Sequence, residues 1–255
     1  MRGFLRRPRW IGLTVFAVAV VAVCVRLGIW QLDRLEGRRE FNDRYAAGLA
    51  AAARPLEDLL RGGGALAYRR VTATGRYDTE HEVILYGRAL DGQPGNHLLT
   101  PLVLTDGRAV LIDRGWVPFE MDEPPVAAAA PPRGEVEVVG PLFAGRAGGA
   151  GEVPEGGDRV TTVRTVDLDA IARDVPYELV PWFVQLQTQS PPPGDLPVPE
   201  PAPELDEGPH LSYAFQWFAF ATIAAIGYAI LVRREVVERR SSETPEESDA
   251  GLGGR

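Results

Sequence analysis

The chain has 255 residues, 45% of them hydrophobic, and its 27 basic and 35 acidic side chains give a formal net charge of −8. This length suits one modest domain plus membrane segments, and the acidic charge argues against nucleic acid as a partner. The single cysteine, Cys24, excludes an internal disulfide and any metal site built on paired cysteines.

The first predicted element is a transmembrane helix over residues 10–31, preceded by a short segment, residues 1–9. Trp10 to Val25 is uninterrupted apolar or small sequence, and the run resumes as LGIW after Arg26. A basic start followed by an apolar run also resembles a secretory signal peptide, but no A-x-A cleavage site follows. VAVC approximates a lipoprotein site, but Val23 is bulkier than the small residue normally needed there. We expect a retained anchor.

Residues 32–190 are predicted to form a β-rich, antiparallel extracytoplasmic domain that begins with a solvated continuation of the first helix. Alternating and β-branched runs bounded by Gly, Asp, Asn and Pro predict its strands, at residues 68–78, 81–90, 97–104, 108–118, 135–143, 159–164 and 177–188. A short helix is expected over PLEDLL, with Pro55 in its first turn, and another after Asp167, which is a suitable N-cap. The Gly-rich insert 144–157 is expected to be mobile.

A second transmembrane helix is predicted over residues 210–232, after an extended, Pro-rich acidic tether at 191–209. Leu211 to Val232 carries no formally charged residue, and at ~1.5 Å per residue it spans about 33 Å, enough for a hydrocarbon core of ~30 Å. The tail, residues 233–255, is expected to be disordered. The predicted fold class is therefore an α+β membrane protein, with two helices flanking the β-rich domain.

Arginine is the only strong base, since the chain has no lysine, and its distribution predicts the orientation. Residues 190–210 contain no arginine, whereas four arginines follow the second span: Arg233, Arg234, Arg239 and Arg240. The positive-inside rule then places both termini in the cytoplasm. Exclusive use of arginine indicates a GC-rich bacterial genome, so we expect a multi-pass protein of the bacterial plasma membrane.

Candidate binding residues gather where the two spans reach the outer leaflet. His210, Tyr213, Trp217 and Ala221 recur at spacings of 3, 4 and 4, which places them on one helix face. The first span offers Arg26, Trp30 and Gln31 at a similar depth.

These residue types suit a planar, apolar, anionic cofactor, held by an imidazole on its metal, by aromatic stacking and by an arginine on its carboxylates. The alternative is an ordinary interfacial belt, with a solvated histidine and an arginine that snorkels. Spacing alone leaves both interpretations open.

The most specific stretch of the external domain is LTDGRAVLIDRGWVP, which has a purely structural interpretation. Val110 and Ile112 are expected to face a core, and Gly115 to permit a backbone twist. Arg114 beside Asp113 is expected to form a surface or hairpin ion pair worth at most about 1 kcal/mol.

Catalysis by the external domain has little support in the sequence. His81 and His97 lie in separate strand patterns without second-ligand spacing, so no metal site is expected there. No GxSxG elbow, P-loop or GxGxxG is present. We expect that the protein is not an enzyme.

Four stretches together resemble the surfeit-locus family of cytochrome c oxidase assembly factors. They are LGIWQLDR (27–34), YRRVTATGRYD (68–78), DGQPGNHLLTPLVLTDGRAVLIDRGWVP (91–118) and HLSYAFQWFAFA (210–221). They occur in the family's order, and the resemblance covers roughly residues 10–235. Gly37, Arg38 and Asp113 depart from residues that are common in the family.

The resemblance implies help in assembling the haem-copper oxidase, with haem a bound transiently and passed to the oxidase catalytic subunit. It implies His210 as the iron ligand and Trp217 as an associated residue. Proteins of haem a synthesis are further expected partners. The rival hypothesis is a membrane-anchored scaffold that docks oxidase subunits without binding haem.

Overall fold

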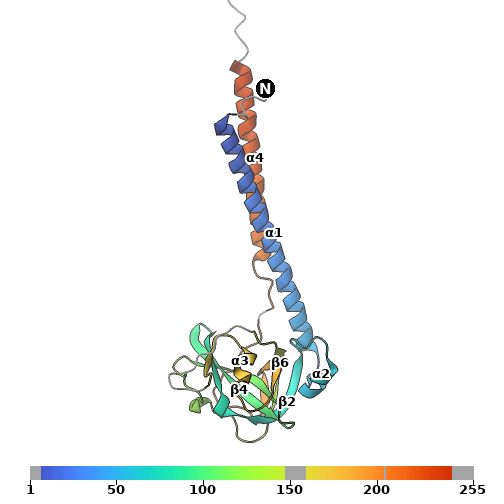
Figure 1. The fold of residues 1–255 in the computed structure, drawn as a ribbon. Helices are drawn as coiled ribbons and strands as arrows, with labels where there is room; N and C mark the ends of the chain where they lie inside the picture. Colours follow the sequence, from blue (N-terminus) through green and yellow to red (C-terminus); the bar gives the residue numbers. More distant parts are fainter. Residues whose placement is uncertain (1–6, 147–158, 204, 243–255) are drawn as a thin grey trace, which may run out of the picture. The chain divides into compact units, whose positions relative to one another are not determined.

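A computed structural model describes residues 7–146, 159–203 and 205–242 of the chain. The chain divides into two units, which are described separately (Figure 1). The helix unit contains the residues up to Phe41 and those from Asp206 onward, and the sheet unit contains Asn42–Leu205.

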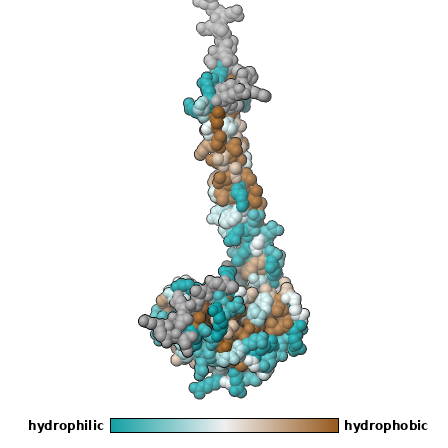
Figure 2. Space-filling model, in the orientation of Figure 1, coloured by the Kyte–Doolittle hydropathy of each residue, from teal (hydrophilic) through white to brown (hydrophobic). Residues whose placement is uncertain are grey.

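The helix unit is built from two long helices, α1 (Pro8–Ala50) and α4 (His210–Ser242). Both are long and apolar enough to cross a membrane. Only 11% of the most apolar window of α1 and 6% of that of α4 is buried, so most apolar side chains there have no protein cover (Figure 2). Uncovered apolar surface of this extent marks these helices as candidate membrane spans rather than core helices.

Both helices extend beyond the predicted spans. α1 continues to Ala50, as expected for a solvated continuation of the first span, while α4 runs on through Ser242. The start of the segment predicted to be a disordered tail is therefore helical. The rest of that tail and most of the Gly-rich insert lie outside the described residues.

The sheet unit contains short and long strands that follow one another along the chain. In the described residues they are β1 (Arg54–Pro55), β2 (Arg70–Tyr77), β3 (Val83–Leu90), β4 (Gln93–Leu104), β5 (Ala109–Pro118), β6 (Val136–Phe143), β7 (Thr162–Val163), β8 (Leu179–Gln185) and β9 (Thr188–Ser190). Each predicted strand region contains at least one of them.

These strands form one sheet that closes on itself. β2 pairs with β6, β6 with β8, β8 with β5 and β5 with β4, and β4 pairs with β2 again to complete the ring. β3 and β7 extend the sheet beyond β4, while β1 adds to β2 and β9 to β6. The ring is thus a small barrel with a side extension.

The sheet is mixed rather than wholly antiparallel. β3, β4 and β5 are consecutive antiparallel neighbours, but the pairs β1–β2, β3–β7 and β5–β8 are parallel. Parallel neighbours require long connections, and sixty residues separate the end of β5 from the start of β8. Local strand patterns carry no information about such distant pairings.

The barrel interior is the main hydrophobic core. Every ring strand contributes to it, and α2 (Leu56–Gly62) adds Leu56 and Leu59. Val110 and Ile112 of β5 are fully buried in this core, which confirms their predicted orientation. Leu111, between them, points to a second cluster that includes residues of α3 (Leu168–Ala172).

The two short helices begin at or next to the residues that the sequence indicates. Pro55 is the residue before α2, and the Asp167 carboxylate accepts a hydrogen bond from the Ala170 N–H at the start of α3, 3.1 Å away. The expected helix start at Asp167 is confirmed, and α2 begins one residue later than expected, at Leu56.

A β-bulge interrupts the pairing of β4 with β5. His97 lies opposite Trp116 and Leu99 lies opposite Asp113, so β5 has one residue more than β4 between these pairs. Gly115, in the bulge, has a φ of +114°, a conformation that L side chains rarely adopt.

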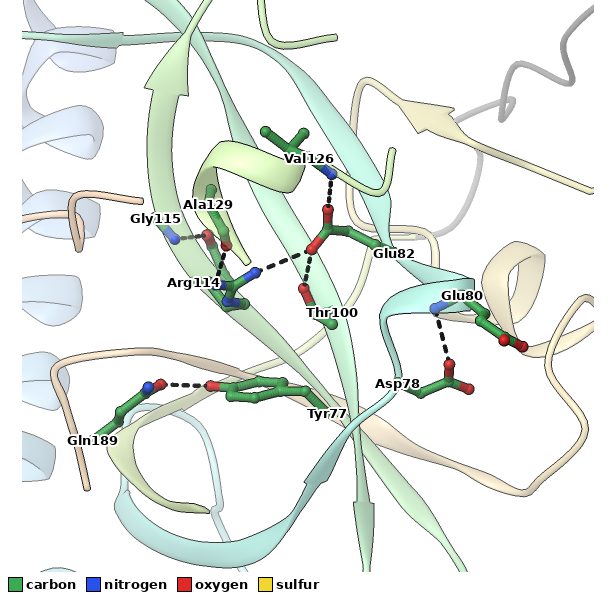
Figure 3. Close-up of polar contacts among 11 residues, drawn as sticks. Tyr77, Asp78, Glu80, Glu82, Thr100, Arg114, Gly115, Val126, Ala129 and Gln189 are labelled. Carbon is green, nitrogen blue, oxygen red and sulfur yellow. Dashed lines mark hydrogen bonds and ion pairs between the residues drawn. The ribbon is translucent and has the colours of Figure 1, made fainter. Parts of the chain in front are cut away.

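Arg114, also in the bulge, makes a buried ion pair with Glu82, at 3.0 Å between Nη1 and Oε2 (Figure 3). Each residue is 1% exposed. Glu82 also accepts hydrogen bonds from the Thr100 hydroxyl (2.8 Å) and the Val126 N–H (2.9 Å), and Arg114 donates to the Ala129 carbonyl oxygen. All the charged groups of this network therefore have partners.

The expected surface ion pair between Arg114 and Asp113 is wrong. The bulge turns the guanidinium into the protein, where it lies 5.3 Å from the centroid of the Tyr77 ring. Burial lowers the pKa of Arg114, while the charge of Glu82 acts in the opposite direction. Burial also raises the pKa of Tyr77.

The predicted Pro-rich tether is partly docked on the sheet unit. Val198 forms a backbone bridge with Trp116, with N···O distances of 2.7 and 2.8 Å. A Cβ at Gly115 would collide with the Val198 carbonyl group, so this close approach depends on glycine. Residues 196–199 therefore belong to the folded unit rather than to a free extended segment.

Candidate functional site

Small side chains line the contact between α1 and α4. Cys24 on α1 and Ala214 and Ala221 on α4 are buried. The seven-residue step from Ala214 to Ala221 is the heptad spacing of paired helices. Further along, the Thr14 and Tyr228 hydroxyl groups are hydrogen bonded at 2.5 Å.

Gly28 of α1 lies directly against the ring of Phe218 of α4. A Cβ at this position would lie 2.7 Å from two ring carbons of Phe218, so a larger residue must displace that ring. We expect Gly28→Val to increase the helix separation by about 1–2 Å, the spread that side chains produce in helix contacts. Pulsed EPR between spin labels at Ile29 and Leu211, in a chain with Cys24→Ser, measures this change.

Gly12→Val is the matched control, because a Cβ at Gly12 meets no atom within 4 Å. It is expected to leave the distance distribution unchanged. An unchanged distribution in the Gly28→Val protein would contradict the close contact at Gly28.

His210 is the first residue of α4 and contacts α1 through one ring nitrogen. Its Nδ1 lies 2.9 Å from the side-chain oxygen of Gln31. Because an amide oxygen only accepts, Nδ1 is the donor in this hydrogen bond, and Nε2 is the nitrogen that a neutral imidazole can offer to a metal. A Cβ at Gly208 would lie 3.6 Å from Nε2, in van der Waals contact with the ring, so the glycine leaves this side of the ring less covered. Metal-binding histidines are commonly oriented by such a second hydrogen bond.

An open pocket of about 520 Å³ adjoins His210. Its lining is mostly polar and consists of Asp33, Arg34, Gly37, Arg38, Phe41, Asp206, Gly208 and His210. Guanidinium groups are suited to binding carboxylates. The arrangement therefore offers a nitrogen ligand beside cationic and aromatic side chains.

Two ion pairs fasten the residues before α4 to α1. Arg38 Nη2 lies 3.2 Å from the Asp206 carboxylate, and Arg39 Nε lies 2.7 Å from that of Glu207. The hydrogen bond from Arg39 lowers the pKa of Glu207. These contacts position Gly208 and hence the start of α4 within the helix unit.

The other predicted site residues lie at different parts of the helix surface. Trp217 is half-buried and makes an edge-to-face contact with Phe220, at 6.0 Å between ring centroids. Tyr213 and Trp30 are 46% and 44% exposed, and Arg26 is also exposed. The structure thus brings Gln31 to His210. Tyr213, Trp30 and Arg26 lie outside the buried contact between α1 and α4.

The sequence interpretation missed the pocket residues Arg34, Arg38 and Gly208. Both arginines fit the pattern of a solvated helix, and the glycine fits a flexible tether. The i, i+4 spacing of Arg34 and Arg38, three and seven residues beyond Gln31, is the signal that places them on the same face as that residue.

Comparisons with known proteins match most of the sequence of this chain. The model of the SURF1 family matches residues 18–222. A SURF1-like protein of Mycobacterium tuberculosis is 31% identical over 247 residues, which cover 93% of this chain and 88% of that protein. A SURF1-like protein of Rickettsia felis is 25% identical over 219 residues, which cover 84% of this chain and 94% of that protein. Surfeit locus protein 1 of Takifugu rubripes is 29% identical over 141 residues, which cover 49% of this chain and 59% of that protein.

Proposed function

The chain belongs to the SURF1 family, and we therefore propose that it is an assembly factor for haem-copper cytochrome c oxidase. In this proposal it binds haem a transiently at His210 and presents it to the oxidase catalytic subunit. It carries cargo and catalyses no reaction. Proteins of haem a synthesis are the proposed donors.

The observation that supports haem binding is the position of the His210 ring. Nδ1 is hydrogen bonded to Gln31, and the ring lines an open pocket, so Nε2 is the nitrogen that can bind iron there. A haem needs an axial nitrogen, cationic partners for its propionates and apolar or aromatic contacts for its ring. His210, Arg34 and Arg38, and Phe41 offer these groups.

Release is as important as binding for a carrier. A single imidazole at the end of a helix pair, without a second protein ligand enclosed around it, suits an affinity that a buried oxidase site can exceed. Trp217 remains a proposed haem contact, as do Tyr213, Trp30 and Arg26.

We further propose that both helices cross the bacterial plasma membrane with the termini in the cytoplasm. The two candidate spans and the arginines that follow α4 support this orientation. The sheet unit then lies outside the cytoplasm, where it docks on oxidase subunits.

A membrane-anchored scaffold without haem is the second candidate function. It is favoured by the hydrogen bond to Gln31, which satisfies one His210 nitrogen without any ligand. In a scaffold, the sheet unit would recognise an oxidase subunit and the helices would only anchor it.

Oxidase assembly in cells separates the two functions. Variants are expressed in a strain that lacks this protein, and oxidase activity and the haem a content of the oxidase are measured. If the protein is a haem carrier, His210→Ala should give no increase in either quantity over the strain alone. Gln216→Ala, on the exposed face of α4, should restore both to the wild-type level. Full restoration by a normally expressed His210→Ala protein would instead support the scaffold.

A further inference from the structure

Three potential metal ligands, two from paired strands and one from a segment much later in the chain, meet in the sheet unit. They are His97 of β4, Asp113 of β5 and Glu200 of the docked segment after β9. We propose that they bind a divalent transition metal ion of the Zn²⁺ type.

The β-bulge creates the inner half of this site. It sets the Asp113 carboxylate beside the His97 ring, with Nδ1 3.0 Å from the carboxylate. The other carboxylate oxygen accepts a hydrogen bond from the Gly115 N–H at 3.1 Å. His97 is 3% exposed and Asp113 is 4% exposed, so both ligands are held inside the protein.

The docked segment supplies the third ligand. Glu200 follows the backbone bridge of Val198 with Trp116, and its Oε2 accepts a hydrogen bond from Gln185 at 2.7 Å. The same oxygen lies 3.8 Å from His97 Nδ1. One ligand atom from each of the three residues lies within 4.8 Å of the other two, which is close enough to share one ion.

The charge of the cluster favours a cation. Two carboxylates face one imidazole, so even a protonated His97 leaves a formal charge of −1. The Asp113 carboxylate, which is removed from water, requires a compensating charge. Arg88 lines the adjacent pocket, yet among the described residues it forms no ion pair with Asp113 or Glu200.

The ligand set also indicates the class of metal. One imidazole nitrogen with two carboxylate oxygens suits Zn²⁺, whereas Ca²⁺ and Mg²⁺ prefer oxygen ligands alone. Asp113 and Glu200 border a pocket of about 260 Å³, which gives space for water as a further ligand. The Gly115 and Gln185 hydrogen bonds orient the carboxylates, as groups around metal sites commonly do.

A bound ion would fasten the segment around Glu200 to β4 and β5. This role concerns the sheet unit alone, so its test is independent of haem and of oxidase assembly. Zn²⁺ should therefore slow hydrogen exchange at the backbone N–H groups of this segment, those of Leu196, Val198, Glu200 and Ala202.

Calorimetric titration of ZnCl₂ into the full chain in detergent, stripped of metal and free of a histidine tag, tests the proposal. We expect one Zn²⁺ per chain, and an affinity at least about tenfold weaker in Glu200→Gln, since losing even a partner of a ligand has that effect. Glu200 has a side chain that is 47% exposed, and glutamine keeps an acceptor for Gln185. The fold should therefore tolerate this change. Glu137→Gln, at an exposed position of β6, is the matched control.

Selective loss of Zn²⁺ affinity and of the exchange protection in Glu200→Gln would support the site. Equal binding by the wild type and Glu200→Gln, or no binding by the wild type, would overturn it. His97→Gln should weaken binding further than Glu200→Gln does. Because His97 is buried, Glu200→Gln is the deciding test where His97→Gln does not fold.

Discussion

Replacing Arg114 by methionine is expected to lower the free energy of unfolding of the sheet unit by about 3–5 kcal/mol, the usual cost of removing one partner of a buried ion pair. The change leaves the Glu82 carboxylate, 1% exposed, with only the Thr100 hydroxyl and the Val126 N–H as donors. It also removes the donor to the Ala129 carbonyl oxygen. Urea denaturation of the full chain in detergent, followed by tryptophan fluorescence, measures the loss.

Arg108→Met is the matched control for this prediction. Arg108 also pairs with an acidic residue, Asp106, but its side chain is 34% exposed, so the loss should be under about 1 kcal/mol. Replacing Glu82 and Arg114 together by leucine and methionine should cost less than the sum of the single changes, because no uncompensated charge remains. Equal losses in Arg114→Met and Arg108→Met would show that burial of the pair does not matter.

Replacing His210 by alanine should produce the largest loss of haem affinity of any change in the helix unit. The proposed haem site has one axial nitrogen from this chain, and alanine removes it. Gln31→Leu keeps the imidazole but removes the hydrogen bond at Nδ1, and it should weaken binding by about 10–100-fold, as loss of a partner of a metal-bound histidine does. Titration of haem a into the purified full chain, followed by absorption, gives both affinities.

Gln216→Ala serves as the control for that titration, because Gln216 lies on the exposed face of α4. Its affinity should equal that of the wild type. The order of affinities should be wild type, Gln31→Leu and then His210→Ala. If the Gln31→Leu protein bound haem a as tightly as the wild type, this would contradict the role of Gln31 in orienting the His210 ring.

Local patterns in the sequence were sufficient to predict most elements of the fold. Both long apolar runs are helices, Asp167 caps α3 as expected, and α2 begins within one residue of its expected start at Pro55. These features depend on residues near one another in the chain, where side-chain periodicity and capping act directly. The local sequence alone is therefore enough to predict these helices.

The position of Arg114 could not be predicted in the same way. Whether a strand residue points inward depends on register, and the bulge at Arg114 and Gly115 shifts the register by one residue. The partner of Arg114, Glu82, lies 32 residues earlier in the chain. No spacing rule links two such residues.

The helix pair shows a smaller difference of the same kind. A spacing of 3, 4 and 4 places Tyr213 with His210 and Trp217, but the buried residue of that turn is Ala214. A small residue allows the helices to approach, whereas tyrosine at that place would separate them. Which face of α4 is buried therefore depends on α1 as well as on the periodicity of α4.

The cluster of His97, Asp113 and Glu200 had no signal in the sequence. Its members come from a hairpin with an irregular register and from a Pro-rich segment that resembles a free linker. Docking of that segment depends on the absence of a side chain at Gly115, a detail visible only in three dimensions.

The most direct test of the proposed function is the absorption spectrum of the chain purified from cells that make haem a, for the wild type and for His210→Ala. The wild type should carry haem a bands that are missing from an equal amount of folded His210→Ala protein. Equal haem content in the two proteins would contradict the assignment of His210 as the ligand and leave the anchored scaffold as the better explanation.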